Sequence, residues 1–294
     1  MITGKTNHMK IAIIGHGYVG KAIEKLFHEH AQLIIYDPAE FPADRPDFKL
    51  EIRKYVNECD LAVICVPTPM SEDGKCDTSL VEETLEWLAT PLVLIKSTIP
   101  PGTTEILQAV YGKRICFSPE YIGEGKYFVQ FWKYPHPTEM KYHDFMIIGG
   151  EEPIRSRIVD IFAAALGPGC RFHKTDSKTA ELVKYMENSW GAMKVTFANE
   201  FFEIAKAFGV DYQEARELFL LDGRVERMHT MVRADSRGFG GKCFPKDVNA
   251  IVKASERSGY EPKLLKQVLK SNDEFRNTNA SGTGNSGNPT GTSK

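Results

Sequence analysis

Short apolar runs alternate with helix-like segments over the first half of the chain. Runs typical of buried strands lie at residues 10–14, 33–36, 61–66, 92–95, 114–117, 145–148 and 170–173. Apolar residues recur at helical spacing between several of these runs, at 22–27, 78–89, 103–110 and 152–166. Strands that alternate with helices are typical of a parallel sheet with helices on both faces. We therefore predict an α/β domain with a doubly wound parallel sheet over residues 9–174.

The pattern becomes continuously helical after this domain. Residues 176–209 keep a helical period throughout, with Asp176 or Ser177 as a candidate cap and Gly209 as a candidate end. Shorter helices are predicted at 211–221, 245–258 and 262–276. We predict an all-helical domain over 175–276 that is built on one long central helix. Residues 277–294 are mostly Asn, Ser, Gly and Thr, which predicts a disordered tail.

A glycine-rich turn joins the first predicted strand to the first helix. Residues 15–20 read Gly-His-Gly-Tyr-Val-Gly, and Asp37 ends the second strand. In this context the glycines let a dinucleotide's pyrophosphate approach the helix, and the acid accepts hydrogen bonds from a ribose diol. A carboxylate there repels a 2′-phosphate and favours NAD over NADP. We predict an NAD-binding, Rossmann-like domain; the alternative is a glycine turn that binds nothing.

Three further loops follow strands of the predicted sheet, at residues 66–69, 96–103 and 118–125. Ligands of doubly wound sheets gather where the strands end, so these loops are candidate site segments. The last loop carries two carboxylates, Glu120 and Glu124. Ordinary turn chemistry is the alternative, because Pro, Gly and Ser are common in turns. The aromatic segment 127–137 could stack on a base or sugar, but we expect it to pack on its own domain.

The stretch 238–247 brings one cysteine to the start of a predicted helix. It reads Gly-Phe-Gly-Gly-Lys-Cys-Phe-Pro-Lys-Asp, and Pro245 suits the first helical turn. A helix N-terminus favours negative charge, so the thiol of Cys243 should ionise more easily there. Asp247 lies four residues later, on the same helix face. Cysteine and acid indicate nucleophilic chemistry; the alternative is a glycine turn with Cys243 as a small buried hydrophobe.

Lys184 and Asn188 lie four residues apart on the long helix, hence on one face. A lysine and an amide that point into a cleft could stabilise charge that develops on a reacting oxygen. The alternative is a solvated helix face.

Composition narrows the possible classes of protein. The 294 residues allow two domains, and a formal net charge of −2 gives no electrostatic basis for binding nucleic acid or an anionic membrane. No apolar run approaches the roughly 18 residues of a membrane span. The six cysteines are scattered, without a Cys-x-x-Cys or a His pair at metal-ligand spacing. We expect reduced thiols, a cytoplasmic protein and no metal site.

The motifs, in this order, resemble the UDP-glucose/GDP-mannose dehydrogenase family. The resemblance runs from about Lys10 to Arg276 and rests on the segments 15–20, 96–103, 119–125, 180–188, 199–200 and 238–247. It implies a four-electron oxidation of a nucleotide sugar to its carboxylate with two NAD, most simply UDP-glucose to UDP-glucuronate. It also implies a cytoplasmic homodimer formed along the central helix.

The resemblance also implies roles for individual residues. Cys243 would capture the intermediate aldehyde as a thiohemiacetal that becomes a thioester, assisted by Lys184, Asn188, Asp247, Thr98 and Glu124. The NAD site would comprise Gly15, Gly17, Tyr18, Val19, Gly20, Asp37, Val66, Thr68, Thr98 and Glu124. The substrate site would comprise Glu120, Tyr121, Lys184, Asn188, Phe239, Gly240 and Gly241.

The chain departs from the family pattern at several places. Gly123 stands where the family usually has arginine, and Lys242 where it has a small residue. The segment 127–137 is longer than usual, and the family's second Rossmann-like domain is not in this sequence. We expect Lys242, Arg237 or the aromatic segment to compensate in substrate binding.

Two alternative functions remain at the level of sequence. A β-hydroxyacid-type dehydrogenase shares the two domains and the Lys-x-x-x-Asn pair, but it removes two electrons and has no use for Cys243. A non-catalytic NAD-binding remnant is the other alternative.

Overall fold

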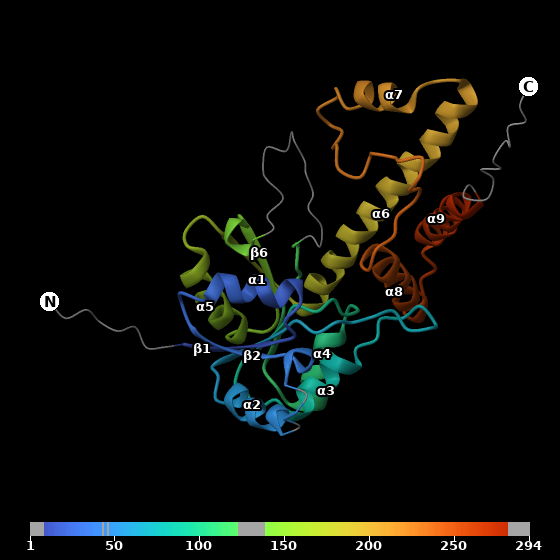
Figure 1. Ribbon diagram of the computed structural model, residues 1–294. Coiled ribbons are helices and arrows are strands. Elements are labelled where there is room, and N and C mark those ends of the chain that lie inside the picture. The colour runs from blue at the N-terminus through green and yellow to red at the C-terminus, as the bar shows by residue number, and fades with distance from the viewer. Residues whose placement is uncertain (1–8, 43, 46, 123–138, 282–294) are drawn as a thin grey trace, which may run out of the picture. The chain divides into compact units, whose positions relative to one another are not determined.

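The computed structural model describes residues 9–42, 44–45, 47–122 and 139–281, with side chains to residue 277. The chain forms two compact units (Figure 1). The first comprises Met1–Ser71 and Cys76–Lys184, and the second comprises Glu72–Lys75 and Tyr185–Lys294. Glu124, Gly123, the aromatic segment 127–137 and most of the predicted tail lie outside the described residues.

The first unit is built on a seven-stranded sheet with the order β2-β1-β3-β4-β5-β6-β7. Its strands are β1 (Lys10–Ile14), β2 (Gln32–Tyr36), β3 (Leu61–Ile64), β4 (Val93–Ile95), β5 (Ile115–Phe117), β6 (Phe145–Gly149) and β7 (Arg171–Thr175). All neighbouring pairs are parallel except β5 and β6, which meet antiparallel at Phe117 and Gly149. The predicted parallel sheet is thus confirmed except at this one pair. An apolar run predicts a strand but carries no information on its direction.

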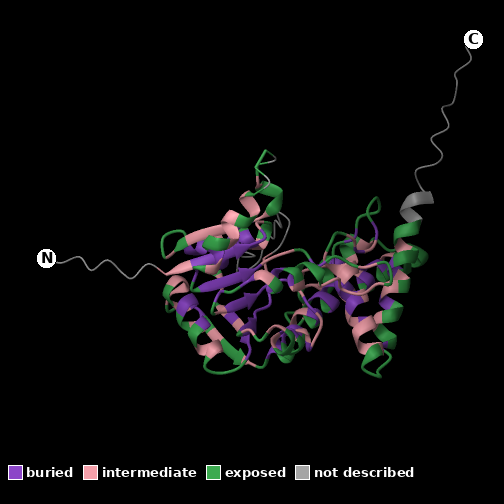
Figure 2. Cartoon of the chain, turned by 90° about the horizontal axis from the view of Figure 1, so that it is seen from below, coloured by how far each residue is buried: buried purple, intermediate pink, exposed green. Residues whose placement is uncertain are grey.

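Helices cover both faces of this sheet. They are α1 (Tyr18–Phe27), α2 (Phe48–Asn57), α3 (Ser79–Trp87), α4 (Thr103–Tyr111) and α5 (Ile154–Leu166), with short 3₁₀ turns η1 (Pro38–Glu40) and η2 (Met140–Tyr142). Successive residues of a strand point to opposite faces. Ala12 and Ile14 accordingly join a core with α2, α3 and α4, whereas Ile11 and Ile13 join a core with α1 and α5. The doubly wound fold is confirmed, and the strands form its buried layer (Figure 2).

Helix α2 was not predicted from the sequence. Val56 is the buried residue of this helix, while Leu50 is exposed. Apolar residues do recur in the segment at helical spacing, at Phe48, Ile52 and Val56, so the signal was present and was missed.

The second unit is helical. It contains most of α6 (Ser177–Phe208), which begins in the first unit, together with α7 (Tyr212–Phe219), α8 (Phe244–Arg257) and α9 (Lys263–Ser281). Its core joins α6, α8 and α9 through Ala192, Val248 and Val268, with Phe239 from the glycine-rich loop. The long central helix is confirmed, and α9 continues past its expected end at Arg276.

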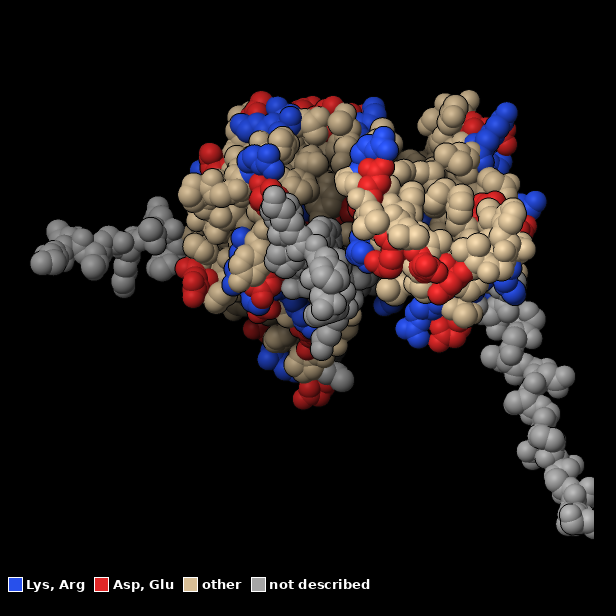
Figure 3. All heavy atoms as spheres, turned by 90° about the horizontal axis from the view of Figure 1, so that it is seen from above, with Lys and Arg blue, Asp and Glu red and all other residues tan. Residues whose placement is uncertain are grey.

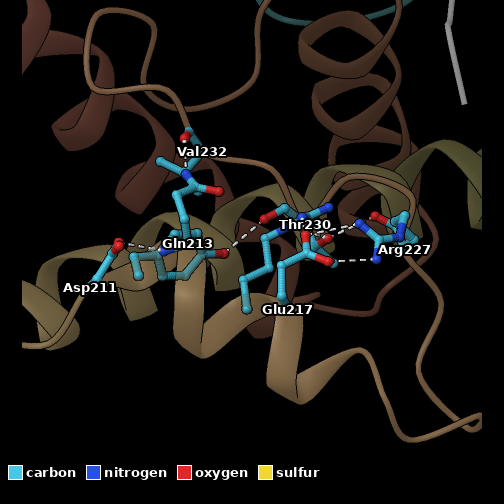
Figure 4. A network of polar contacts seen from close by, with 8 residues as sticks. Asp211, Gln213, Glu217, Arg227, Thr230 and Val232 are labelled. Atoms are coloured by element: carbon cyan, nitrogen blue, oxygen red, sulfur yellow. Dashed lines mark hydrogen bonds and ion pairs between the residues drawn. The ribbon is translucent and has the colours of Figure 1, made fainter. Parts of the chain in front are cut away.

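A polar network fastens the loop between α7 and α8 onto α7 (Figure 4). Asp211 caps α7 by accepting the backbone N–H of Gln213 at 2.9 Å, and the Gln213 side chain donates to the carbonyl of Val232. Glu217 accepts two hydrogen bonds from the Arg227 guanidinium, at 2.9 and 2.7 Å. These contacts support the segment that leads into the cysteine-containing stretch.

Basic and acidic side chains are interspersed on the face of the molecule in Figure 3, in keeping with the small net charge. Within the described part of the chain, no helix is both long and apolar enough to cross a membrane.

Candidate functional site

The glycine turn after β1 has the form that a dinucleotide site needs. Gly15 has φ +88°, and a Cβ atom there would lie 2.7 Å from the carbonyl oxygen of Cys65. A Cβ atom on Gly20 would lie 2.1 Å from the carbonyl oxygen of Gly15, so α1 approaches the turn more closely than any other residue allows. Around Gly17, in contrast, no described atom lies within 4 Å of a Cβ position. Its open side leaves room for a ligand.

The N-terminus of α1 offers backbone donors to an anion. Gly17 occupies the N-cap position and has no side chain with which to satisfy them. The first turn consists of Tyr18, Val19 and Gly20, so it brings no carboxylate that would compete with an anion. Unpaired N–H groups and the helix dipole at such an end favour a phosphate group. The turn and the helix therefore fit the pyrophosphate of NAD.

Asp37 follows β2 directly and is fixed by the main chain. One carboxylate oxygen accepts the N–H of His16 at 2.7 Å, and the other accepts the N–H of Ala39 at 3.0 Å, which caps η1. A carboxylate has about four acceptor sites, so both oxygens can still accept hydrogen bonds from ribose hydroxyls. Its position at the end of β2 fits the adenosine ribose of NAD.

The loops after β3 and β4 are joined to each other. The hydroxyl of Thr68 donates to the carbonyl of Thr98 at 2.8 Å, and the hydroxyl of Ser97 donates to the carbonyl of Val66 at 2.7 Å. Three residues predicted for the cofactor site, namely Val66, Thr68 and Thr98, thus lie together at the carboxyl ends of neighbouring strands.

A buried ion pair fixes the loop after β5. The ammonium of Lys96 lies 3.1 Å from a carboxylate oxygen of Glu120, and the two residues are 4% and 8% exposed. The other Glu120 oxygen accepts the N–H groups of Tyr121 and Ile122. Burial alone would raise the pKa of Glu120, but Lys96 and His143 hold it below its ordinary value. Glu120 is therefore a fixed carboxylate at physiological pH.

Lys184 lies beside this loop. Its ammonium is 5.3 Å from the centre of the Tyr121 ring, at the distance of a cation–π contact. The structure thus brings together three predicted substrate residues of the first unit: Glu120, Tyr121 and Lys184.

Glu181 was not singled out from the sequence, although it lies in the same motif as Lys184. It is fully buried and accepts the N–H and the hydroxyl of Thr104, at 2.8 and 2.6 Å, as well as the N–H of Gly102. These donors belong to the start of α4, so Glu181 binds α6 to the loop that contains Thr98. Burial raises the pKa of Glu181 to about 7.

The predicted nucleophile stands at the start of α8. Cys243 is the N-cap residue, is half-buried, and accepts the N–H of Asp247 on its carbonyl at 2.8 Å. Pro245 lies in the first helical turn, as predicted. The cysteine thus stands at the helix start that the sequence predicted, and easier ionisation of its thiol there stays a prediction.

Asp247 and Asn188 meet in the interior of the second unit. The Asn188 amide donates to one oxygen of Asp247, and the ammonium of Lys246 pairs with the other. Asp247 is 1% exposed. The sequence predicted both residues for the site but not their direct contact, which joins α6 to the first turn of α8.

Two asparagines hold the glycine-rich loop by its main chain. The Asn272 side chain accepts the N–H of Phe239 at 2.6 Å and donates to its carbonyl at 3.1 Å. Asn199 accepts the N–H of Gly238 at 3.1 Å and the Nε–H of Arg237 at 2.7 Å. The Phe239 side chain is 3% exposed and packs in the helical core, so this residue anchors the loop.

The next residues of the loop are less enclosed. A Cβ atom on Gly240 would collide with the guanidinium of Arg276, whereas around Gly241 no described atom lies within 4 Å of a Cβ position. Gly241 has φ +75°, which few other residues adopt. Lys242 is exposed.

Comparison with known proteins places these features in context. Residues 39–163 match the model of the NAD-binding domain of the UDP-glucose/GDP-mannose dehydrogenase family. Residues 178–274 match the central domain of the same family.

Individual relatives agree with this match. UDP-glucose 6-dehydrogenase AglM of Haloferax volcanii is 28% identical over 90% of this chain and 70% of the relative. UDP-glucose 6-dehydrogenase TuaD of Bacillus subtilis is 26% identical over 91% of this chain and 63% of the relative. The structure of a UDP-glucose dehydrogenase from Pyrobaculum islandicum superposes with a TM-score of 0.74 at 27% identity, covering 93% of this chain and 70% of the other. The chain thus spans about two thirds of the length of these relatives.

Proposed function

The chain belongs to the UDP-glucose/GDP-mannose dehydrogenase family, and from this premise we propose that it performs the four-electron oxidation of a nucleotide sugar to its uronate. The observation that carries the proposal is the buried contact of Asn188 on α6 with Asp247, which lies in the first turn of the helix that Cys243 caps. A two-electron dehydrogenase needs no thiol at this position. A nucleophile beside a buried acid and an amide suits covalent capture of an aldehyde.

NAD binds to the first unit, where the turn at Gly15 and Gly17, the start of α1 and Asp37 fit it. When bound, it supplies the hydride acceptor for each of two oxidations. Val66, Thr68, Thr98 and Glu124 complete this half of the proposed site.

In the first oxidation the substrate alcohol loses a hydride from carbon and a proton from oxygen. Lys184 and Asn188 stabilise the negative charge that develops on this oxygen as the proton leaves. Asp247, assisted by Thr98 and Glu124, handles the proton. The product of this step is an aldehyde.

Covalent capture keeps the aldehyde on the enzyme. The thiolate of Cys243 adds to the aldehyde carbon, and the oxygen takes up a proton to give a thiohemiacetal. Loss of a second hydride from that carbon, with the oxygen proton, leaves a thioester. Water then adds to the thioester carbon, the C–S bond breaks, and the carboxylate is released with regenerated thiol. We assign the orientation of the hydrolytic water to Asp247, which lies in the first turn of the helix that Cys243 caps.

The substrate is proposed to bind through Glu120, Tyr121, Lys184, Asn188, Gly240 and Gly241. Phe239 contributes by anchoring the loop. We propose UDP-glucose as the substrate and UDP-glucuronate as the product, since curated relatives over most of this chain carry the name UDP-glucose 6-dehydrogenase. This would place the enzyme in nucleotide-sugar metabolism that feeds polysaccharide biosynthesis.

We also propose a cytoplasmic homodimer formed along α6. Large apolar side chains stay exposed along this helix at positions spaced by three, four or seven residues: Leu182, Met186, Trp190, Phe197, Phe201, Ile204 and Phe208. A stripe of this kind is typical of a helix that packs against another. Sedimentation of wild type and Phe197→Asp tests it, because a dimer through α6 should dissociate in the variant.

The proposed function is tested by counting NADH. Purified protein is incubated with UDP-glucose, UDP-N-acetyl sugars or GDP-mannose and excess NAD, and NADH and carboxylate are both measured. Two NADH for each carboxylate support the proposal. One NADH for each substrate would indicate a two-electron dehydrogenase, and no NADH with any sugar nucleotide would favour a non-catalytic NAD-binding protein.

A further inference from the structure

His16 occupies the variable position of the glycine fingerprint and bridges two carboxylates. Its Nδ1 lies 2.9 Å from an oxygen of Glu40 in η1, and its Nε2 lies 2.8 Å from an oxygen of Glu24 in α1. The side chain is 11% exposed. Neither the dinucleotide fingerprint nor the proposed reaction requires a histidine here.

The geometry requires the charged form of the ring. A neutral imidazole donates from one nitrogen only and would turn a lone pair toward the other carboxylate. With an acid at each nitrogen, both must carry a proton. Burial lowers the pKa of His16, but the hydrogen bonds that the ring donates to Glu24 and Glu40 outweigh it and raise the pKa above its ordinary value.

The same residue fixes a third carboxylate. The backbone N–H of His16 donates to Asp37, which also accepts the N–H of Ala39 and whose carbonyl accepts the N–H of Glu40. Asp37 and Glu40 are therefore both fastened to His16 at the end of β2. This is the end of the sheet where the adenosine ribose of NAD binds.

We propose that Glu40 is a specificity-determining residue that excludes the 2′-phosphate of NADP, and that His16 is the positioning residue that holds it. Asp37 alone suffices to bind a ribose diol. The groups that face the imidazolium are Glu24 on α1, Glu40 in η1 and, through the main chain, Asp37 at the end of β2. With one positive and three negative charges, the cluster keeps a net negative charge that repels an added phosphate. The inference concerns cofactor choice and does not depend on which sugar is oxidised.

Direct binding of NAD and NADP to the full chain, measured by titration calorimetry, tests the role of Glu40. In Glu40→Gln we expect NADP affinity to rise roughly tenfold and NAD affinity to stay within about threefold of wild type. Glu29→Gln, which removes one charge from an exposed position just after α1, is the matched control. An unchanged NADP affinity in Glu40→Gln, or an equal gain in Glu29→Gln, would overturn the proposal. Retained NAD binding reports that each variant is folded.

A double-mutant cycle tests the role of His16. If His16 positions Glu40, the gain in NADP affinity from Glu40→Gln should be several-fold smaller in a His16→Gln background. In the wild-type background this gain should also shrink as pH rises through the pKa of His16, because a neutral ring can donate to only one of its two acids. The His16→Gln background should show no such pH dependence. Equal gains in both backgrounds at every pH would refute the positioning role.

Discussion

The side-chain amide of Asn188 donates a hydrogen bond to the carboxylate of Asp247, 59 positions further along the chain. Both residues are buried, and Asp247 lies in the first turn of the helix that Cys243 begins. The contact fixes an acid and an amide at one point of the helical unit. Its consequences for activity and stability can be measured separately.

Removal of the Asn188 amide should cost stability. Asn188→Ala leaves a buried carboxylate oxygen without its donor, so we expect unfolding to become easier by about 1–3 kcal/mol. Urea denaturation followed by circular dichroism measures this change. Ser189→Ala is a control on the same helix, because the Ser189 hydroxyl is buried without a hydrogen-bond partner among the described residues. An equal loss in both variants would contradict a specific role for the amide.

Replacement of the thiol should separate the two oxidations. In Cys243→Ser, formation of carboxylate should fall by roughly 10³-fold or more, because an alcohol is a far weaker nucleophile than a thiolate. NAD binding should be unchanged, since Cys243 lies outside the NAD-binding unit. Product analysis after single and multiple turnovers checks this. Wild-type rates of carboxylate formation would refute the nucleophile assignment.

The ribose contact at Asp37 is open to a direct test. Asp37→Ala should raise the Michaelis constant for NAD about tenfold, because it removes a charged acceptor for the ribose hydroxyls and frees the N–H of His16. The Michaelis constant for the sugar nucleotide should hardly change. Steady-state kinetics with each substrate varied in turn distinguish these effects. An unchanged value for NAD would place the ribose contact elsewhere.

Asn272 should control the sugar-nucleotide site without touching the cofactor. Asn272→Ala removes both hydrogen bonds to Phe239, so the loop should loosen and the Michaelis constant for the sugar nucleotide should rise. The loss of stability should be about 1–3 kcal/mol. Gln267→Ala, on the same helix but bonded only to Ser271 within the described chain, is the control. If NAD affinity falls as much as sugar affinity, the effect is general unfolding and not loop positioning.

Glu181 predicts how stability depends on pH. Its pKa is raised to about 7 by burial, so the folded protein holds this proton more tightly than the unfolded chain does. The contribution of Glu181 to the free energy of unfolding is fully present below the pKa of the unfolded chain. It is lost as pH rises through about 7, by roughly 3 kcal/mol in total. Melting temperatures of wild type and Glu181→Gln should be measured between pH 4.5 and 8. The two should be similar at acid pH, and the wild type should fall below Glu181→Gln as pH rises toward 8. Parallel curves would contradict the prediction.

Local signals were sufficient to predict most of the architecture. The apolar strand runs, the long helical period of α6 and the turn at Gly15, Gly17 and Gly20 each depend on neighbouring residues, and the structure contains all of them. The helix start at Cys243 was predicted on the same basis, because Pro245 suits the first helical turn.

What the sequence did not indicate depends on contacts between distant segments. Lys96 pairs with Glu120, Glu181 caps α4, and Asn272 binds Phe239, each across a long stretch of chain. None of these residue types carries a periodic signal of its own. The antiparallel direction of β6 was missed for a similar reason, since strand direction depends on the connection between strands and not on the apolar run.

The asparagine contacts with the glycine-rich loop have a consequence for how this enzyme could acquire new substrates. Asn199 and Asn272 bind Gly238 and Phe239 through main-chain groups, so these contacts do not depend on the side chain at position 242. Lys242 and the preceding residue, Gly241, are both exposed. Evolution can therefore exchange the residue beside the nucleophile without disturbing the loop's anchorage. A saturation library at Lys242 should keep the wild-type melting temperature while the preference among sugar nucleotides varies.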